Sequence, residues 1–506
     1  MSPRARRAEL WVVFGLATLL TLGIGLHGRL AEQRVNWDGL AAVAHANDVF
    51  RAERGANLAM IGFVQPPLPA LLQLPVVLLV PALASSGIAA NLLGALAAGA
   101  AAALLLGICA ETGLRRAWRW PLVALFALHP MVLGPAACGA PMALLTALLL
   151  GAAWALLRWS QSEGLRELIT ASVLLAAALI TRYEAIFIVA GALIYLAWRT
   201  LRGGGSWSKL EGTLITFGLP IAYVAGVWVI ANWAIMGDPW HFLRETFASR
   251  GGADAAEMLS SSLRLTMVWF FPALALVYNQ MRGVGRRPAA ARPVAWLVMT
   301  AILAPALFPA VFASLGPAGD WSRLVTVLAM VLAGGYVMLA ALLGERLRGE
   351  ADGAPMHGTL VIAAASLGVA IWLAGSGGLL ASAGAAYRGS GPLTASARAE
   401  LSAAGLLRDT ELPPGRKHVI VGWPGFAVVL FSGRTGEMAV LRTEDLPEHR
   451  DELWAGSRIV ILVGEQHGGV PPTVVQDDLG LGPRLELQPR WGAGPWECYV
   501  VSRSSR

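Results

Sequence analysis

Apolar runs long enough to cross a lipid bilayer recur along this chain, and they constrain its fold more than any other feature. A run of roughly 17–25 apolar residues can span about 30 Å of hydrocarbon as a helix. Of the 506 residues, 56% are hydrophobic and only 14% are charged, whereas soluble globular domains average about 25% charged residues. The runs do not alternate as the strands of a membrane β-barrel would. The sequence therefore predicts an α-helical polytopic membrane protein.

Arginine is concentrated in the short connections between these runs. The positive-inside bias places such connections in the cytoplasm, together with the N-terminal MSPRARR. The Arg-rich connections are 111–120, 158–167, 199–209, 281–293 and 344–350. The outward segments are then 27–65, about 130–140, about 181–185, 235–263 and 314–321. The net charge of +7 therefore reflects basic residues that set the membrane topology. We expect no nucleic acid among the partners.

The alternation predicts about eleven crossings of a cell inner (plasma) membrane, with the N-terminus in the cytoplasm. An odd number of crossings puts the C-terminus on the extracytoplasmic side. The expected spans are 10–26, 88–110, 120–136, 141–158, 167–181, 185–199, 211–234, 264–280, 294–313, 322–343 and 358–376.

One further apolar segment, PPLPALLQLPVVLLVPALA at 66–84, is long enough to cross as well. If it crossed, the Arg-rich connection at 111–120 would move outside and every later connection would invert. Its five prolines favour a broken helix that lies at, or dips into, the outer interface. The alternative is that it crosses and that one later span is misassigned.

The composition changes after residue 385. Short β-branched and aromatic runs such as RKHVIVGWPGFAVVLF and WECYVVSR alternate with turns rich in proline and glycine. We therefore expect two domains: a transmembrane catalytic domain at 1–384, with outer loops at 27–65 and 235–263, and a small soluble α/β domain at 385–506 outside the membrane.

Charged side chains gather in the outward segments. Asp38 in NWDG follows the first helix, where a carboxylate can reach a substrate at the interface and act as a general base. An arginine at the head of an outward helix suits a phosphate, although such arginines also reach toward lipid headgroups. Solvated pairing within the loops is the simpler interpretation for most of the other charges. The predicted substrate-binding residues are Asp48, Glu53, Arg182, Glu184, His241, Arg244 and Arg323.

The outer face of the membrane offers no nucleotide donors. The cytoplasmic connections are too short for a nucleotide-binding domain, and no Walker or Rossmann pattern follows a strand. The three cysteines are far apart with no CxxC spacing, so they indicate neither a metal site nor a disulfide framework. An enzyme on this face needs a donor that the membrane delivers already activated. A polyprenyl-phosphate sugar fits, with its tail in the bilayer, its phosphate on arginines and its sugar near the carboxylates.

Several stretches share an order with a known family. They are NWDGLAAVAHANDVF, FVQPPLPALLQLP, LFALHPMVLGPAACGAPMALLTALLL, LITRYEAIFIVAGAL, NWAIMGDPWHFLRE and DWSRLVTVLAMVLAGGY. Together they cover roughly residues 8–345. The chain resembles the GT-C-fold glycosyltransferases of the family 39 type, which include protein O-mannosyltransferases and aminoarabinose transferases.

The resemblance implies a role for three of the predicted residues. Asp38 matches the acid that serves as the presumed base, and Arg182 and Arg323 match positions that neutralise the donor phosphate. The reaction implied is attack by an acceptor hydroxyl with inversion at the anomeric carbon.

The chain departs from the family at two places. Gln65-Pro66-Pro67 stands where the family often has His-Pro-Pro. Gly139 and Ala140 stand where many relatives carry an acid that helps to bind metal or sugar. A divalent cation, if one is used, would need Asp48, Glu53 or Glu184 instead.

The sequence leaves two other functions open. One is a polytopic transporter or flippase for lipid or sugar, although the chain shows no internal repeat and few charges at mid-membrane. The other is a non-catalytic envelope-assembly subunit, which the missing acid near residue 140 favours. The favoured prediction remains a glycosyltransferase that uses a polyprenyl-phosphate donor, with membrane lipid around it and an envelope glycan, lipid or protein as acceptor.

Overall fold

The computed structural model describes residues 3–51, 57–248, 335–337, 395–411, 418–421, 425–434, 437–441, 460–463 and 485–503. These residues belong to two compact units. The helical unit takes its described residues from Met1–Gly25, Phe63–Pro69 and Asn91–Thr394, and the mixed unit takes its own from Leu26–Gly62, Ala70–Ala90 and Ala395–Arg506.

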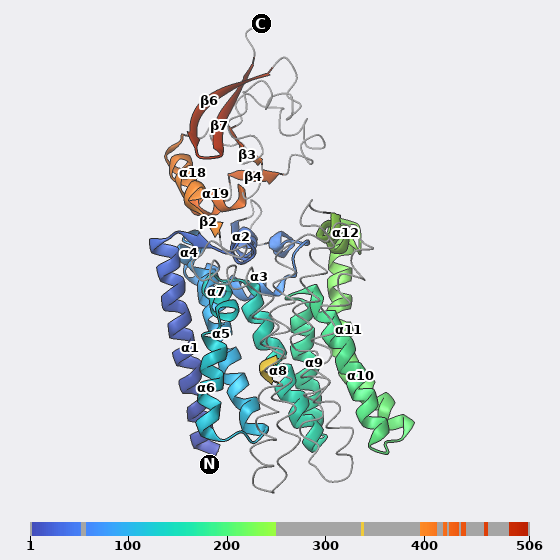
Figure 1. Cartoon of the computed structure of the whole chain (residues 1–506). Helices are drawn as coiled ribbons and strands as arrows, with labels where there is room; N and C mark the ends of the chain where they lie inside the picture. The colour runs from blue at the N-terminus through green and yellow to red at the C-terminus, as the bar shows by residue number, and fades with distance from the viewer. Residues whose placement is uncertain are drawn as a thin grey trace, which may run out of the picture. The chain divides into compact units, whose positions relative to one another are not determined.

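Five helices in the described part of the chain are long and apolar enough to cross a membrane (Figure 1). They confirm a helical, polytopic membrane fold. The five are most of α1 (Pro3–Ala31), α5 (Ile88–Glu111), α8 (Pro141–Ser162), α10 (Ile186–Arg202) with the preceding turn η2 (Tyr183–Ala185), and α11 (Trp207–Met236). The last four predicted spans lie outside the described residues except for 335–337, so the count of eleven stays a prediction.

The predicted span 120–136 is interrupted in the structure. It consists of α6 (Arg116–Ala127) and α7 (Pro130–Ala137), separated at residues 128–129. Pro130 explains the break, because a proline disfavours helical backbone at the residue before it. The next helix, α9 (Leu165–Leu179), has 15 residues and is shorter than the candidate spans.

The helical unit is organised around α8. In its most apolar window, 78% of the residues of α8 are buried, compared with 17% for α11, so α11 presents most of its surface outward. One core cluster joins α1, α5, α6 and α8 through side chains such as Val13, Leu105 and Phe126. A second cluster joins α8 to α9, α10 and α11.

Close helix contact in this unit depends on a small residue at Gly99 of α5. A Cβ atom there would collide with Thr18 Oγ1 and would lie 2.7 Å from the carbonyl oxygen of Phe14, both on α1. Small residues let backbones approach in this way, and in membranes such packing replaces the missing hydrophobic driving force between helices.

The segment at 66–84 is a broken helix, as its prolines predict. It forms α3 (Leu68–Leu79) and α4 (Pro81–Ser85), with the break at Val80 just before Pro81. Neither helix is long enough to be a candidate span. Its position at the outer interface stays a prediction.

The mixed unit contains a five-stranded sheet. Its order is β4 (Met438–Leu441), β3 (His418–Val421), β5 (Val460–Val463), β7 (Trp496–Arg503), β6 (Leu485–Ala493). The first three strands are parallel, and β7 pairs antiparallel with both β5 and β6. With α18 (Arg398–Asp409) and α19 (Gly425–Ser432), this arrangement is the α/β structure that the sequence predicts. The expected boundary at 385 lies outside the described residues.

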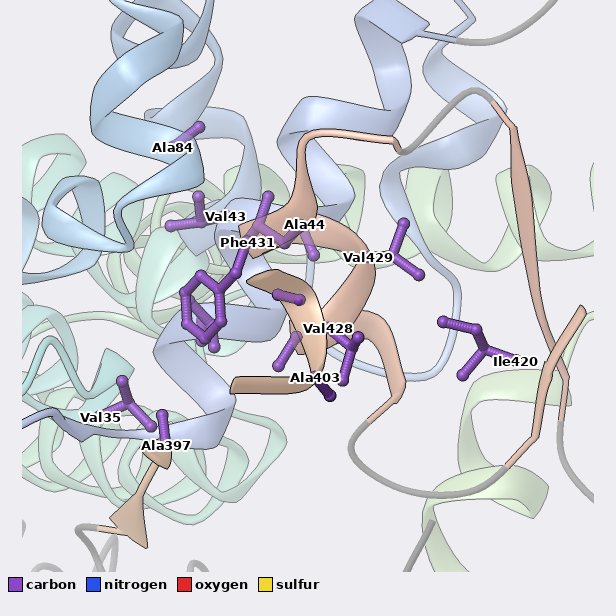
Figure 2. Packing of buried hydrophobic residues seen from close by; sticks show 14 of the residues in the cluster. Val35, Val43, Ala44, Ala84, Ala397, Ala403, Ile420, Val428, Val429 and Phe431 are labelled. Carbon is purple, nitrogen blue, oxygen red and sulfur yellow. The ribbon is translucent and has the colours of Figure 1, made fainter. Parts of the chain in front are cut away.

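The mixed unit joins the segment after α1 to the C-terminal residues. Strand β1 (Arg34–Val35) pairs antiparallel with β2 (Ala395–Ser396), and helix α2 (Trp37–Arg51) packs on α19. Figure 2 shows the shared core, where Val43 and Ala44 of α2 lie among Val428 and Phe431 of α19. Segments separated by more than 350 positions therefore bury a single hydrophobic cluster.

Phe431 tests this shared core. The ring is 2% exposed and lies 4.8 Å from the guanidinium carbon of Arg29, which in turn donates from Nε to the carbonyl oxygen of Ser86 at 2.7 Å. Phe431→Ala should lower the free energy of unfolding by about 3–5 kcal/mol, because it opens a cavity between the loop and the C-terminal residues.

The measurement is denaturant unfolding of the purified full chain, followed by tryptophan fluorescence. Leu406→Ala on α18, where the side chain is 38% exposed, is the control and should change stability by about 0.5 kcal/mol at most. Equal losses in the two variants would contradict the shared core.

Candidate functional site

The predicted catalytic acid lies in the first turn of α2. The helix is capped by Asn36, whose Oδ1 accepts a hydrogen bond from the N–H of Gly39 at 2.9 Å. Asn36 is itself 7% exposed, so the cap is held firmly. Asp38 is partly buried, and its charge is favoured near the positive end of the helix dipole.

Helix α2 is almost entirely buried, and no residue between Trp37 and Phe50 is fully exposed. Between Trp37 and Phe50, the only partly exposed residues that do not pack on the shared core are Asp38, His45 and Asp48. The spacings of seven and three residues put all three on the same side of the helix. Asp38 and Asp48 therefore lie on the same side of α2, ten positions apart.

His45 was missed by the sequence analysis, and the structure explains its environment. Gly62, with φ at +85°, passes so close that a Cβ atom there would lie 2.9–3.0 Å from three atoms of the imidazole ring. Burial lowers the pKa of His45 to about 4, so the ring is neutral at pH 7. Its seven-residue spacing from Asp38 was the available signal.

A second group of predicted residues belongs to the helical unit. Arg182 directly precedes the turn η2 between α9 and α10, and Glu184 within that turn is 7% exposed. Between these two residues, Tyr183 accepts a hydrogen bond from Nε1–H of Trp228 at 3.1 Å and packs on Phe242 with ring centroids 5.1 Å apart. This aromatic cluster holds the turn against α11 and α12 (His241–Ala248).

Arg244 and His241 lie on α12, next to that cluster. The guanidinium of Arg244 pairs with the carboxylate of Asp238, whose Oδ1 also accepts the N–H of Trp240 at 3.1 Å. Slight desolvation raises the pKa of Asp238, but these two hydrogen bonds and the charge of Arg244 outweigh it, so the pKa lies below its usual value. Arg244 is 70% exposed, and exposed pairs of this kind contribute little stability. A phosphate can therefore displace Asp238 at small cost.

The structure leaves two of the predicted site residues undescribed. Glu53 and Arg323 lie outside the described residues. Within the described ranges, no group of three or more His, Cys, Asp or Glu side chains could hold a metal ion. Near the missing family acid, Gly139 has φ at +81° and Ala140 is the buried N-cap of α8.

Comparisons with known proteins confirm the resemblance at the level of the fold. A scan of protein-family models and a search of curated proteins found no match. Among solved structures, the chain is similar to the aminoarabinose transferase ArnT from Cupriavidus metallidurans bound to undecaprenyl phosphate, with a TM-score of 0.55 and 13% identity over 99% of this chain and 98% of that one. The apo state of the same transferase gives a TM-score of 0.56 and 14% identity over 98% of both chains.

The buried imidazole predicts a pH dependence of stability. The folded pKa of His45 is about 4, below the unfolded value near 6.5, so only the unfolded chain takes up this proton between those values. This contribution to stability is complete above pH 6.5 and is lost as the pH falls toward 4. His45→Asn should remove that part of the dependence.

The measurement is the melting temperature of the full chain and of the variant at pH 7 and pH 5. The melting temperature of the native chain should fall more between pH 7 and pH 5 than that of the variant. A parallel decline in both proteins would show that His45 is not buried as a neutral ring.

Proposed function

We propose that this protein is an integral membrane glycosyltransferase that moves a sugar from a polyprenyl-phosphate donor to an envelope glycan, lipid or protein. The full-length likeness in fold to ArnT, which was solved with undecaprenyl phosphate bound, is the main support. The carboxylates of Asp38 and Asp48 on α2 supply groups that can accept a proton or bind a sugar. Transfer takes place on the extracytoplasmic face, with the N-terminus in the cytoplasm and the C-terminal residues outside.

Asp38 is the general base in this proposal. Its carboxylate takes the proton of the acceptor hydroxyl as that oxygen attacks the anomeric carbon. The bond between the anomeric carbon and the phosphate oxygen breaks in line, and polyprenyl phosphate leaves with the electron pair. The configuration at the anomeric carbon inverts.

The arginines stabilise the leaving phosphate. Arg182 and Arg323 carry this role from the resemblance, and Arg244 joins them after releasing Asp238. A guanidinium holds a phosphate through paired, charge-assisted hydrogen bonds. Asp48, Glu53, Glu184 and His241 contact the sugar or, if a divalent cation takes part, supply its ligands.

Replacing the base tests the mechanism. Asp38→Asn keeps the side-chain shape and removes the proton acceptor, so transfer of labelled sugar from a polyprenyl-phosphate donor should fall by at least about 100-fold. The matched control is Asp409→Asn on α18, where the carboxylate is exposed, and it should retain full activity.

The melting temperature of both variants should match that of the native chain. Unchanged transfer in a folded Asp38→Asn protein would remove the assignment of the base. Movement of sugar across sealed vesicles with no new glycosidic bond would favour a transporter. No transfer and no movement by the native chain would favour an envelope-assembly subunit, as Gly139 and Ala140 allow.

Cysteine labelling tests the orientation. Ala117 is exposed at the start of α6, and Ser402 is exposed on α18. In a Cys138→Ser background, Ala117→Cys should resist a membrane-impermeant maleimide on intact cells, whereas Ser402→Cys should react. The other two cysteines are buried and should stay silent. Reaction at position 117 from outside would invert the topology.

A further inference from the structure

A polar cavity lies in the helical unit, where α8 and α10 end and α9 and α11 begin. Its volume is about 260 Å³, and its lining includes Glu163, Arg199 and Lys209 with the hydroxyls of Thr213 and Thr216. The two Arg-rich connections at 158–167 and 199–209 meet at this end of the helices. It is therefore the end that the charge pattern predicts to be cytoplasmic, and it is separate from the turn that carries Arg182.

The charged side chains that line this cavity carry a net positive charge. Glu163 binds Lys209 at 2.7 Å and lies 3.9 Å from Nη2 of Arg199, so one carboxylate faces two cations. Hydrogen bonding from Lys209 lowers the pKa of Glu163, which keeps this carboxylate ionised.

Arg199 has unused hydrogen-bonding capacity inside the cavity wall. Its Nη2 reaches the carbonyl oxygen of Ser160 only at 3.4 Å, and its buried Nε has no hydrogen-bond partner. A buried donor without an acceptor is costly, and native structures rarely leave one without a ligand or water.

The backbone at Glu163 adds a second sign of a constrained site. Its φ is +52°, a left-handed conformation that a residue with a Cβ atom adopts at a cost. The chain places the strain on Glu163 even though Gly164, which would adopt this conformation freely, is the next residue. That conformation turns the end of α8 so that the carboxylate reaches Lys209 on α11.

We propose that this cavity binds the phosphate of an anionic phospholipid headgroup from the inner leaflet, with Arg199 and Lys209 as its cations. Nε and Nη of Arg199 supply a planar pair of donors for two phosphate oxygens. The lipid rather than free phosphate is favoured by the apolar border, since Leu165 is 62% exposed beside the cavity. Acyl chains can follow the outward surface of α11, where Ile215 and Leu219 are 57% and 65% exposed.

Two substitutions of opposite sign test the site. Arg199→Gln should reduce retention of phosphatidylglycerol by about tenfold, the loss expected for one charge-assisted contact. Glu163→Gln removes the competing carboxylate and should increase retention. The control is Arg202→Gln, because Arg202 is exposed, stacks on Trp198 and does not line the cavity.

The assay uses the full chain purified in mild detergent, with bound lipid counted by native mass spectrometry after exchange into mixtures of phosphatidylglycerol and phosphatidylcholine. A parallel arm adds inorganic phosphate, which should not displace the lipid. If Arg199→Gln does not fold, Lys209→Gln serves in its place and should also lose retention.

Three results would overturn the proposal. Retention could be equal in all variants, or it could fall in both Arg199→Gln and Glu163→Gln, as expected if the cluster only ties the helix ends together. Displacement by millimolar phosphate would assign the cavity to a soluble anion instead of a lipid.

Discussion

The burial of α19 against α2 is the interaction on which the rest of this structure depends. Helix α2 has only 15 residues, and helices of that length are marginal in water unless packing stabilises them. It packs on the nearby turn η1 (Leu58–Ile61) and on α4, and the C-terminal residues complete its core through side chains such as Val428 and Phe431. The helix that carries Asp38 is therefore positioned in part by a segment that follows it by more than 350 residues.

This dependence assigns a structural role to the C-terminal residues. Their sheet and two helices complete a core that the segment after α1 begins, and the β1–β2 pair adds a backbone connection between Val35 and Ala395. Asp38 and Asp48 stay partly exposed on the other side of α2, where Gly62 covers the ring of His45. In the helical unit, an aromatic cluster around Tyr183 performs the comparable task for Arg182 and Glu184.

Local sequence signals predicted much of the fold. The long apolar helices follow from composition and length, and the break in 66–84 follows from Pro81. The interruption at residues 128–129 also had a local cause in Pro130, but a continuous apolar run concealed it. Pairing of Arg34 with Ser396 had no local signal, because two-residue strands carry no periodicity and their partner is distant.

The residues of the candidate site also differ in whether the sequence carries a local signal for them. Asp38 was predicted from its place after an apolar run and Asp48 from its position on the same loop, and both stay predictions as site residues. His45 was passed over because a lone histidine on a helix carries no motif, and its environment depends on Gly62 folding back over α2. The ion pair of Arg244 with Asp238 required the turn before α12, which sequence spacing does not specify.

Native-state hydrogen exchange of the full chain tests the shared core most directly. Cooperative units exchange together, with one opening free energy and one dependence on denaturant. We expect the amides of α2 and α19 to open in the same unit, with exchange curves that merge as the denaturant concentration rises. Exchange of α2 at a much lower opening free energy, independent of α19, would contradict this expectation.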